Sequence, residues 1–313
     1  MKILVTGSTG LVGSALINQY QSYHGYKLID EWIFLSSQDG DLTKEDNVER
    51  IFNLHQPDIV VHLAANVGGL FKNMYKRAEM YEDNIIMNTF ILKYARIFKV
   101  QKIISILSTC IFPDGIEPLT ENILHHGPPH PSNEGYAYAK RMMEVHGRIL
   151  HSQHQIPCIQ LIPTNIYGPH DNFNLEDAHV IPALIHRCYL AKEKKIPFIV
   201  KGSGKPIRQF IYSYDLAKII LWNIYENNIP GMYICSPPSS HEMTIEHVAR
   251  SIAACMDYEH ALIFDTTCAD GQFKKTVEPH EYFFGLQFTK FNDAIKDTIE
   301  WFITSYQNKN VRI

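Results

Sequence analysis

Tyr136 and Lys140 are the first residues whose types and spacing could do chemistry. They lie four residues apart, which places both on one face of a helix. An ammonium group beside a phenol favours the phenolate, so we expect Lys140 to lower the pKa of Tyr136 from its ordinary value of about 10. A tyrosine tuned in this way can exchange a proton with a substrate oxygen. The spacing is common by chance, so the pair alone also fits an ordinary helix.

Ser108 and Cys110 form a second group of reactive side chains. They follow residues 103–107, which are nearly all apolar. Such a run is typical of a buried parallel strand, and the carboxyl ends of these strands border the ligand crevice of an open α/β sheet. We expect Ser108 to hydrogen-bond a reacting carbonyl alongside Tyr136. Cys110, taken alone, is better explained as a buried packing residue.

A glycine-rich loop lies near the start of the chain. Gly7, Gly10 and Gly13 follow a short apolar run and open a helical pattern, with Leu11 and Val12 between the last two glycines. Glycines at a strand-to-helix turn let a pyrophosphate approach the backbone, and the helix N-terminus supplies free N–H groups. The G-x-x-G-x-x-G spacing is one residue wider at its front than G-x-G-x-x-G. The context predicts a dinucleotide site, and the alternative is a plain tight turn.

The end of the second predicted strand indicates which dinucleotide is bound. An acid at this point would pair with the ribose 2′-hydroxyl of NAD, whereas this chain has Ser36 and Ser37. Two small hydroxyls leave room and donors for a 2′-phosphate, which favours NADP(H). Asp39 lies close enough that a shift in register would weaken the inference. We expect Asp41 and Leu42 near the adenine.

The elements that must position these residues alternate along the chain. Short β-rich runs separated by longer amphipathic segments predict a Rossmann-type, doubly wound α/β fold with a parallel sheet. The expected strands are 3–6, 32–36, 59–63, 103–107 and 158–162. Amphipathic helices are expected at 180–192, 215–225, 244–256 and 291–306, with Thr244 as an N-cap.

Two lobes are expected, because loop-forming stretches at 167–172 and 201–206 interrupt the alternation. The cofactor-binding domain is predicted to contain residues 1–165 and about 207–236. A smaller α/β substrate-binding lobe is predicted to contain about 166–206 and 237–313.

Composition limits the classes of partner. The chain has 313 residues, 45% hydrophobic and 20% charged, with a net charge of −4, so it can bury a large core but has no basic field that would attract nucleic acid. Six cysteines without a C-x-x-C pair fit free thiols in a reducing compartment.

Neither a membrane nor a metal is expected as a partner. The first apolar run is too short for a signal peptide, and no stretch approaches the ~20 residues of a membrane span. We therefore expect a cytoplasmic protein. His125, His126 and His130 lie in a proline-rich loop but lack the spacing of metal ligands, so no metal is expected.

Together the glycine loop, the serine at a strand end and the Tyr–Lys pair resemble the extended short-chain dehydrogenase/reductase superfamily and, within it, the GDP-L-fucose synthase family. The resemblance covers nearly the whole chain. Its most specific segments are residues 63–70, 108–113, 163–173 and 270–275.

The resemblance implies that GDP-4-keto-6-deoxy-D-mannose is converted to GDP-L-fucose by epimerisation at C3 and C5 and NADPH reduction at C4. It makes Cys110 the base and His179 the acid of the epimerisation, roles that suit a thiol and an imidazole. Related dehydratases resemble Thr-Asp-Glu where this chain has Ser108-Thr109-Cys110, which argues against water elimination.

The resemblance also assigns binding residues and an oligomeric state. Beyond the glycine loop and the second strand, the residues expected to contact the cofactor are Ala64, Lys140, Pro163, Asn165 and His179. The residues expected to contact the GDP-sugar are Ser108, Asn165, Arg187, Lys201, Arg208 and Asp270. A homodimer is expected, in which helices of the sheet-bearing domain form a four-helix contact.

Two alternative functions stay open at this point. One is another nucleotide-sugar enzyme of the superfamily, such as a 4-epimerase that keeps its cofactor bound. The other is a non-enzymatic NADP-binding sensor.

Overall fold

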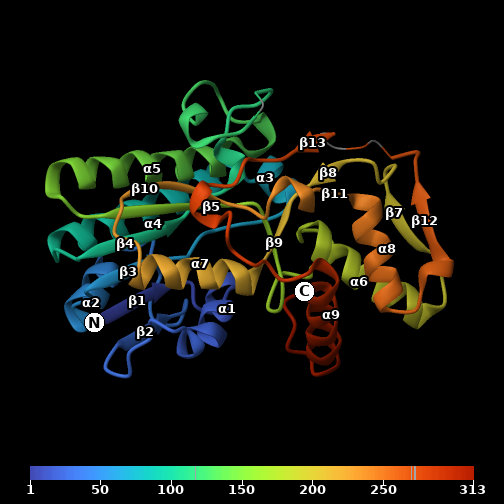
Figure 1. Cartoon of the computed structure of the whole chain (residues 1–313), viewed down its shortest axis with the longest axis horizontal. Helices are drawn as coiled ribbons and strands as arrows, with labels where there is room; N and C mark the ends of the chain where they lie inside the picture. The colour runs from blue at the N-terminus through green and yellow to red at the C-terminus, as the bar shows by residue number, and fades with distance from the viewer. Residues whose placement is uncertain (117, 269, 271–272) are drawn as a thin grey trace.

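Six parallel strands form the central sheet of the computed structural model, in the order β2, β1, β3, β4, β5, β10 (Figure 1). Their bounds are β1 (Lys2–Thr6), β2 (Glu31–Leu35), β3 (Ile59–His62), β4 (Lys102–Ile106), β5 (Cys158–Pro163) and β10 (Gly231–Cys235). The structure describes all residues except 117, 269, 271 and 272, and leaves out the side chains of 70 and 71. Gly271 and Gln272, within one of the resemblance segments, therefore lie outside the described residues.

The expected fold class is confirmed, and each of the five predicted strands matches β1 to β5 to within one residue at either end. The chain runs from β1 to β2 on one side and returns to β3 on the other, so the strand order reverses beside β1. The crevice at this point is where ligands bind in open α/β sheets. The sequence did not predict β10, which begins at a glycine and pairs in parallel with β5.

Helices cover both faces of the sheet, as Figure 1 shows. One face packs on α1 (Leu11–Gln19) and α7 (Ser213–Tyr225), and its core contains Ile3 and Val5. The other face packs on α2 (Glu45–His55), α4 (Arg77–Ile97) and α5 (Glu134–His154), and its core contains Leu4. Because side chains alternate along a strand, β1 is buried on both faces, as a central parallel strand must be.

A third core lies in the smaller lobe, among α6 (Val180–Lys194), α8 (Ile245–Cys255) and α9 (Phe291–Gln307). With α7, these are the four helices predicted from the sequence, each matching to within two residues. The Thr244 side chain caps α8 by accepting a hydrogen bond from the His247 amide at 3.1 Å, as expected. The division into two lobes agrees with the separate cores, while the lobe boundaries stay a prediction.

Short strands tie the smaller lobe together. β7 (Phe198–Lys201) pairs with β12 (Leu262–Asp265), and β8 (Ile207–Arg208) pairs with β11 (Met243–Thr244) and β13 (Lys274–Lys275). β6 (Asn165–Tyr167) pairs with β9 (Phe210–Tyr212). The remaining helices are α3 (Leu70–Tyr75) and the 3₁₀ turns η1 (Tyr20–Ser22), η2 (Thr109–Ile111), η3 (Glu121–Ile123), η4 (Pro131–Asn133), η5 (Ser239–His241), η6 (Glu259–Ala261) and η7 (Glu281–Phe283).

Two further features concern the whole chain. All six cysteines are unpaired. Among the described residues, no helix is long and apolar enough to cross a membrane.

A buried cation joins the sheet to α7. Lys102, at the start of β4, donates hydrogen bonds to the carbonyl oxygens of Asn223 (2.9 Å), Ile224 (2.9 Å) and Asn227 (2.7 Å). Carbonyls at the end of a helix lack intrahelical partners, and an ammonium satisfies them while opposing the negative end of the helix dipole.

We expect Lys102→Met to lower the free energy of unfolding by about 1–3 kcal/mol. Three hydrogen bonds, each with a net contribution of about 1 kcal/mol, are lost, and the removed cost of burying a charge offsets part of this loss. Urea denaturation measures the change. Lys296→Met, at an exposed position of α9, is the control and should change stability by less than about 0.5 kcal/mol. Equal stability of the two variants would contradict the capping role.

Candidate active site

The glycine loop joins β1 to α1, and its three glycines have different surroundings. Gly7 has a φ of +71°, and a Cβ there would lie 2.7 Å from the Ala64 nitrogen. A Cβ at Gly13 would lie 2.4 Å from the Gly7 oxygen. The nearest atom to a Cβ at Gly10 is 3.4 Å away, and Gly10 has an ordinary extended backbone. The fold itself therefore requires Gly7 and Gly13, whereas Gly10 keeps space open at the start of the helix.

The space at Gly10 fits the diphosphate of a dinucleotide. Gly10 is the N-cap of α1, and in the described part of the chain no side chain caps this helix and no acidic residue lies in its first turn. The unpaired N–H groups and the positive end of the helix dipole thus face the crevice beside β1. Leu11 and Val12 begin the helix and contribute backbone N–H groups to this end.

A buried network that sequence reasoning missed holds Ala64 next to this loop. The Thr6 Oγ1 accepts hydrogen bonds from the amides of Leu63 and Ala64, each at 3.2 Å, so its own proton goes to the His62 Nδ1 at 2.8 Å. The His62 Nε2 lies 3.0 Å from the Asn88 Oδ1 on α4. Burial, with a smaller effect of Lys140, lowers the pKa of His62 to about 3, so the imidazole stays neutral and fixes both strand ends.

Hydrogen bonds between neighbouring side chains shape the end of the second strand. β2 ends at Leu35, and Asp39 folds back so that its Oδ2 accepts from the Ser36 amide (2.7 Å) and the Ser36 Oγ (2.9 Å). These hydrogen bonds lower the pKa of Asp39. In the protein alone the Ser36 hydroxyl therefore donates to the Asp39 carboxylate, and its contact with the cofactor stays a prediction. Ser37 is exposed and stays a prediction.

Asp41 and Leu42 also stay predictions as adenine contacts. The Asp41 Oδ1 accepts from the amide (2.9 Å) and the hydroxyl (2.7 Å) of Thr43, and Leu42 packs against the sheet core. The sequence analysis overlooked a cation at this turn: Arg50, on α2, donates to the Asp39 carbonyl. A guanidinium is well suited to phosphate.

Lys140 and Tyr136 lie on the same face of α5, as predicted. The Lys140 Nζ donates to the Ile106 carbonyl at 2.8 Å and lies 5.7 Å from the centre of the Tyr136 ring. Lys140 is only 1% exposed, and burial lowers its pKa to about 8. The expected lowering of the Tyr136 pKa is wrong for the protein alone. Burial, followed by the charge of Cys110, raises it, because removal from water disfavours the charged phenolate.

Cys110 lies in the 3₁₀ turn η2 that follows β4. Ser108 is the N-cap of this turn, and its Oγ accepts from the Cys110 amide at 3.4 Å. Burial raises the pKa of the Cys110 thiol, while Lys275, the hydrogen bond from Ser108 and Lys140 act in the opposite direction. The pKa values of Tyr136 and Lys140 both respond to Cys110. The structure therefore brings four of the predicted residues into one site and adds Lys275.

Lys275 reaches this site from the smaller lobe. In the sequence it is only the last residue of the 270–275 segment, and no spacing rule marks it. β13 pairs with β8 so that Lys275 lies opposite Arg208, and burial lowers the pKa of both side chains. Asn165 is held nearby by a 2.9 Å hydrogen bond from its side chain to the Gln209 carbonyl. Two cations thus border the site on its smaller-lobe side.

Five other predicted residues lie apart from this group: in the described part of the chain, none of them forms a hydrogen bond or an ion pair with the Cys110 side chain or its neighbours. Pro163 ends β5. His179 is the N-cap of α6, where desolvation lowers its pKa against the effect of Asp177. Arg187 is half-buried on α6 and donates to the Leu175 carbonyl at 3.5 Å, and Lys201 ends β7 with its side chain on the exposed face. Both Asp270 oxygens accept from Ser203, at 2.7 Å from the amide and 2.6 Å from the hydroxyl. Their roles stay predictions.

Comparisons with known proteins identify the family of the chain. A model described as "NAD dependent epimerase/dehydratase family" matches residues 3–234. The chain belongs to this family. Within it, the chain is 46% identical to a GDP-L-fucose synthase of Dictyostelium discoideum over 97% of the chain and 96% of that protein. It is 41% identical to a probable GDP-L-fucose synthase of Drosophila melanogaster over 97% of the chain and 98% of that protein.

A solved structure is similar to the chain over its whole length. The chain is 43% identical to a GDP-L-fucose synthetase from Naegleria fowleri bound to NADP, with a TM-score of 0.93 and coverage of 100% of this chain and 95% of that one. The resemblance drawn from the sequence motifs is thereby confirmed, and the epimerase/dehydratase family supplies the fold on which the site is built.

We expect Gly10→Ala to weaken NADPH binding at least about tenfold without changing thermal stability, because the added methyl meets no protein atom closely but fills the space at the helix N-terminus. Isothermal titration calorimetry measures the NADPH affinity, and thermal melting measures the stability. Gly13→Ala is the contrast, since its Cβ would overlap backbone and should destabilise the fold. Unchanged NADPH affinity in Gly10→Ala would argue against diphosphate binding at this loop.

Proposed function

We propose that this enzyme converts GDP-4-keto-6-deoxy-D-mannose to GDP-L-fucose, by epimerisation at C3 and C5 and NADPH-dependent reduction at C4. One observation carries the proposal. A phenol, an ammonium and a thiol from Tyr136, Lys140 and Cys110 meet at the carboxyl end of β4, in a chain whose relatives are named GDP-L-fucose synthases.

Tyr136 serves the reduction as a proton donor. Its raised pKa keeps the phenol protonated near neutral pH, which suits a group that must deliver a proton to the C4 oxygen. NADPH, when bound, supplies the hydride to C4. Below pH of about 8, Lys140 is charged and favours negative charge on the neighbouring phenol after the proton has left. Ser108 donates a hydrogen bond to the same substrate oxygen.

Cys110 serves the epimerisation as the base. Protons on carbons beside a ketone are acidic because the resulting charge spreads onto oxygen, so inversion needs one group to remove a proton and another to return it on the opposite face. Lys275 and Lys140 favour the thiolate that removes the proton. His179 is proposed as the acid because of the family resemblance; desolvation lowers its pKa below the ordinary 6.5, so near neutral pH the imidazole must gain a proton before it can return one.

The cofactor is proposed to be NADPH, bound with its diphosphate at Gly10 and its ribose phosphate near Ser37. Arg50 supports this assignment as a cation beside the turn after β2, and the Naegleria relative is a complex with NADP. The unpaired cysteines support a reducing compartment, and we place the enzyme in the cytoplasm.

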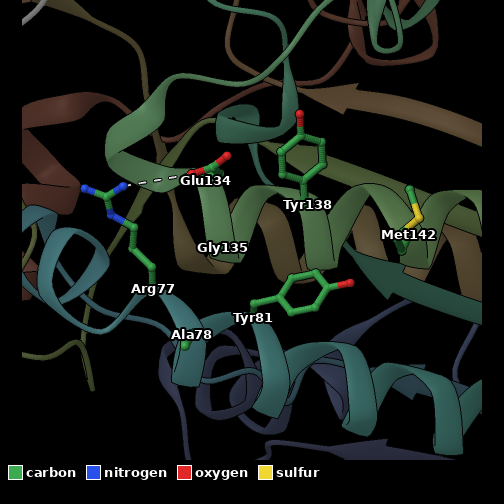
Figure 2. Close-up of a pocket in the computed structure, with 7 residues that line it drawn as sticks. All are labelled: Arg77, Ala78, Tyr81, Glu134, Gly135, Tyr138 and Met142. Atoms are coloured by element: carbon green, nitrogen blue, oxygen red, sulfur yellow. Dashed lines mark ion pairs between the residues drawn. The ribbon is translucent and has the colours of Figure 1, made fainter.

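A homodimer through α4 and α5 is also proposed. A surface pocket of about 400 Å³ lies between the starts of these helices, and Figure 2 draws the residues that line it: Arg77, Ala78, Tyr81, Glu134, Gly135, Tyr138 and Met142. Tyr138 is two residues from Tyr136 and so faces away from the site. Tyr81 and Met142 are 39% and 40% exposed, and Ile86 and Ile149 extend the apolar surface along the two helices. Burying such a face against a second copy would complete a four-helix contact.

Met142→Glu should make the protein monomeric without changing its secondary structure, because a charge would be buried at the centre of the contact. Light scattering during gel filtration measures the mass. Ile263→Glu, 50% exposed on β12 of the other lobe, is the matched control and should leave the mass unchanged. A Met142→Glu protein with the same mass as the wild type would place the contact elsewhere.

Tyr136→Phe should slow NADPH oxidation about 10²–10⁴-fold, since the proton donor is lost, yet retain exchange of solvent deuterium into C3 and C5 of the substrate. Spectrophotometry and mass spectrometry measure the two reactions. A sensor would lose nothing in this variant, and a 4-epimerase would consume no stoichiometric NADPH even as wild type.

Cys110→Ser should show the reverse pattern of defects. We expect deuterium exchange to fall at least about 10²-fold, because a serine hydroxyl is a far weaker acid than a thiol, while NADPH still binds with wild-type affinity. Mass spectrometry of the recovered sugar nucleotide gives the exchange rate. Normal exchange would remove Cys110 from the mechanism.

A further inference from the structure

The segment that carries Ser108 and Cys110 is held at both ends by consecutive residues of α5. Lys140 donates to the Ile106 carbonyl at 2.8 Å, before the segment. Arg141 donates through Nε to the Ile111 carbonyl, directly after Cys110, and through Nη1 to the Gly127 carbonyl at 2.7 Å. The proposed mechanism uses Lys140 but gives Arg141 no role.

The segment has little support of its own. The turn η2 contains three residues, and two of its hydrogen bonds are long: 3.4 Å from the Cys110 amide to the Ser108 Oγ and 3.4 Å from the Phe112 amide to the Thr109 carbonyl. A single 3₁₀ turn has poor hydrogen-bond geometry. The position of the Cys110 thiol therefore depends on contacts from outside the turn, of which the Arg141 hydrogen bond to Ile111 is the nearest in sequence.

Arg141 is a buried charged residue, which is unusual for a side chain whose hydrogen bonds hold a loop. It is only 4% exposed, it has no carboxylate within ion-pair distance among the described residues, and its Nη2 has no hydrogen-bond partner. Burying an unpaired charge costs several kcal/mol, and a neutral side chain could donate to a carbonyl without that cost. The guanidinium lies 5.6 Å from the Tyr138 ring centre, and the groups that favour its charge are Tyr138 and Cys110.

We propose that Arg141 is a positioning residue for Cys110: its two-pronged contact with Ile111 and Gly127 fixes the thiol, and its unpaired charge favours the thiolate. It thereby supports proton removal at C3 and C5 and has no part in the reduction. The inference rests on the proposed function. The other groups that face the thiol are Lys275 of β13, Ser108 of its own segment, and Tyr136 and Lys140 of α5, and all of them remain in the Arg141 variants.

The test compares Arg141→Met and Arg141→Lys with the wild type by the rate of deuterium exchange into C3 and C5, measured across pH with NADP⁺ in place of NADPH. We expect at least about a tenfold loss in Arg141→Met, because a misplaced catalytic group loses rate steeply, and a rise in the apparent pKa of the exchange. Arg141→Lys should restore that pKa but not the full rate, since an ammonium cannot reproduce the planar fork. NADPH affinity should be unchanged in both.

Wild-type exchange rates in both variants would overturn the inference. If Arg141→Met does not fold, Arg141→Lys decides alone, and a wild-type rate there would overturn the positioning role. His125→Ala is the matched control: His125 holds the same loop to α5 through Glu144 at 2.8 Å without touching Ile111, and its exchange should be normal. A His125→Ala profile identical to that of Arg141→Met would mean that Arg141 acts only by docking the loop.

Cys110→Ser separates failure of the inference from failure of the proposed function. If Cys110→Ser exchanges deuterium normally, the thiol is not the base and both are wrong. If Cys110→Ser loses exchange while Arg141→Met keeps it, the proposed function stands and only the role of Arg141 is wrong.

Discussion

The active site depends on one buried hydrogen bond, from the Lys140 ammonium to the Ile106 carbonyl. It fixes α5 against the carboxyl end of β4, and this places a phenol on the helix beside the hydroxyl and thiol that follow the strand. A buried lysine must find acceptors or lose its charge, so the helix can occupy few other positions. The same group thus sets the geometry of the site and supplies its positive potential.

Burial and charge oppose each other throughout this site. Burial raises the pKa of both Tyr136 and Cys110, which keeps the phenol protonated but leaves little of the thiol as thiolate. Lys275 and Lys140 counter the effect of burial on the pKa of Cys110, whereas the second effect on Tyr136, the charge of Cys110, raises its pKa further. One pocket can therefore hold a proton donor and a proton acceptor of similar intrinsic acidity, because their electrostatic surroundings differ.

The sequence was sufficient to predict features that depend only on residues close together in the chain. Apolar runs located β1 to β5, and the four-residue spacing placed Tyr136 with Lys140, because both depend only on the period of one element. It did not predict features that depend on contacts with residues distant in the chain. β10 exists because it pairs with β5, the His62 network joins two strands and a helix, and the burial that reverses the expected pKa of Tyr136 comes from packing. The hydrogen bonds from Ser36 to the nearby Asp39 were also not predicted, since they depend on a turn conformation.

The smaller lobe also places positive charge beside the active-site thiol, in addition to its proposed contacts with the substrate. Its strand β13 is held in register with β8, so that Lys275 and Arg208 lie side by side, and Lys275 is the largest charge effect on Cys110. In the proposed mechanism Lys140 serves both the phenol and the thiol, so changing it should disturb reduction and epimerisation together. Lys275 and Arg141 both interact with the charge of Cys110, and neither affects the pKa of Tyr136. The proposed epimerisation can therefore be tuned from the smaller lobe through Lys275 and from α5 through Arg141, while the reduction depends on Tyr136 and Lys140.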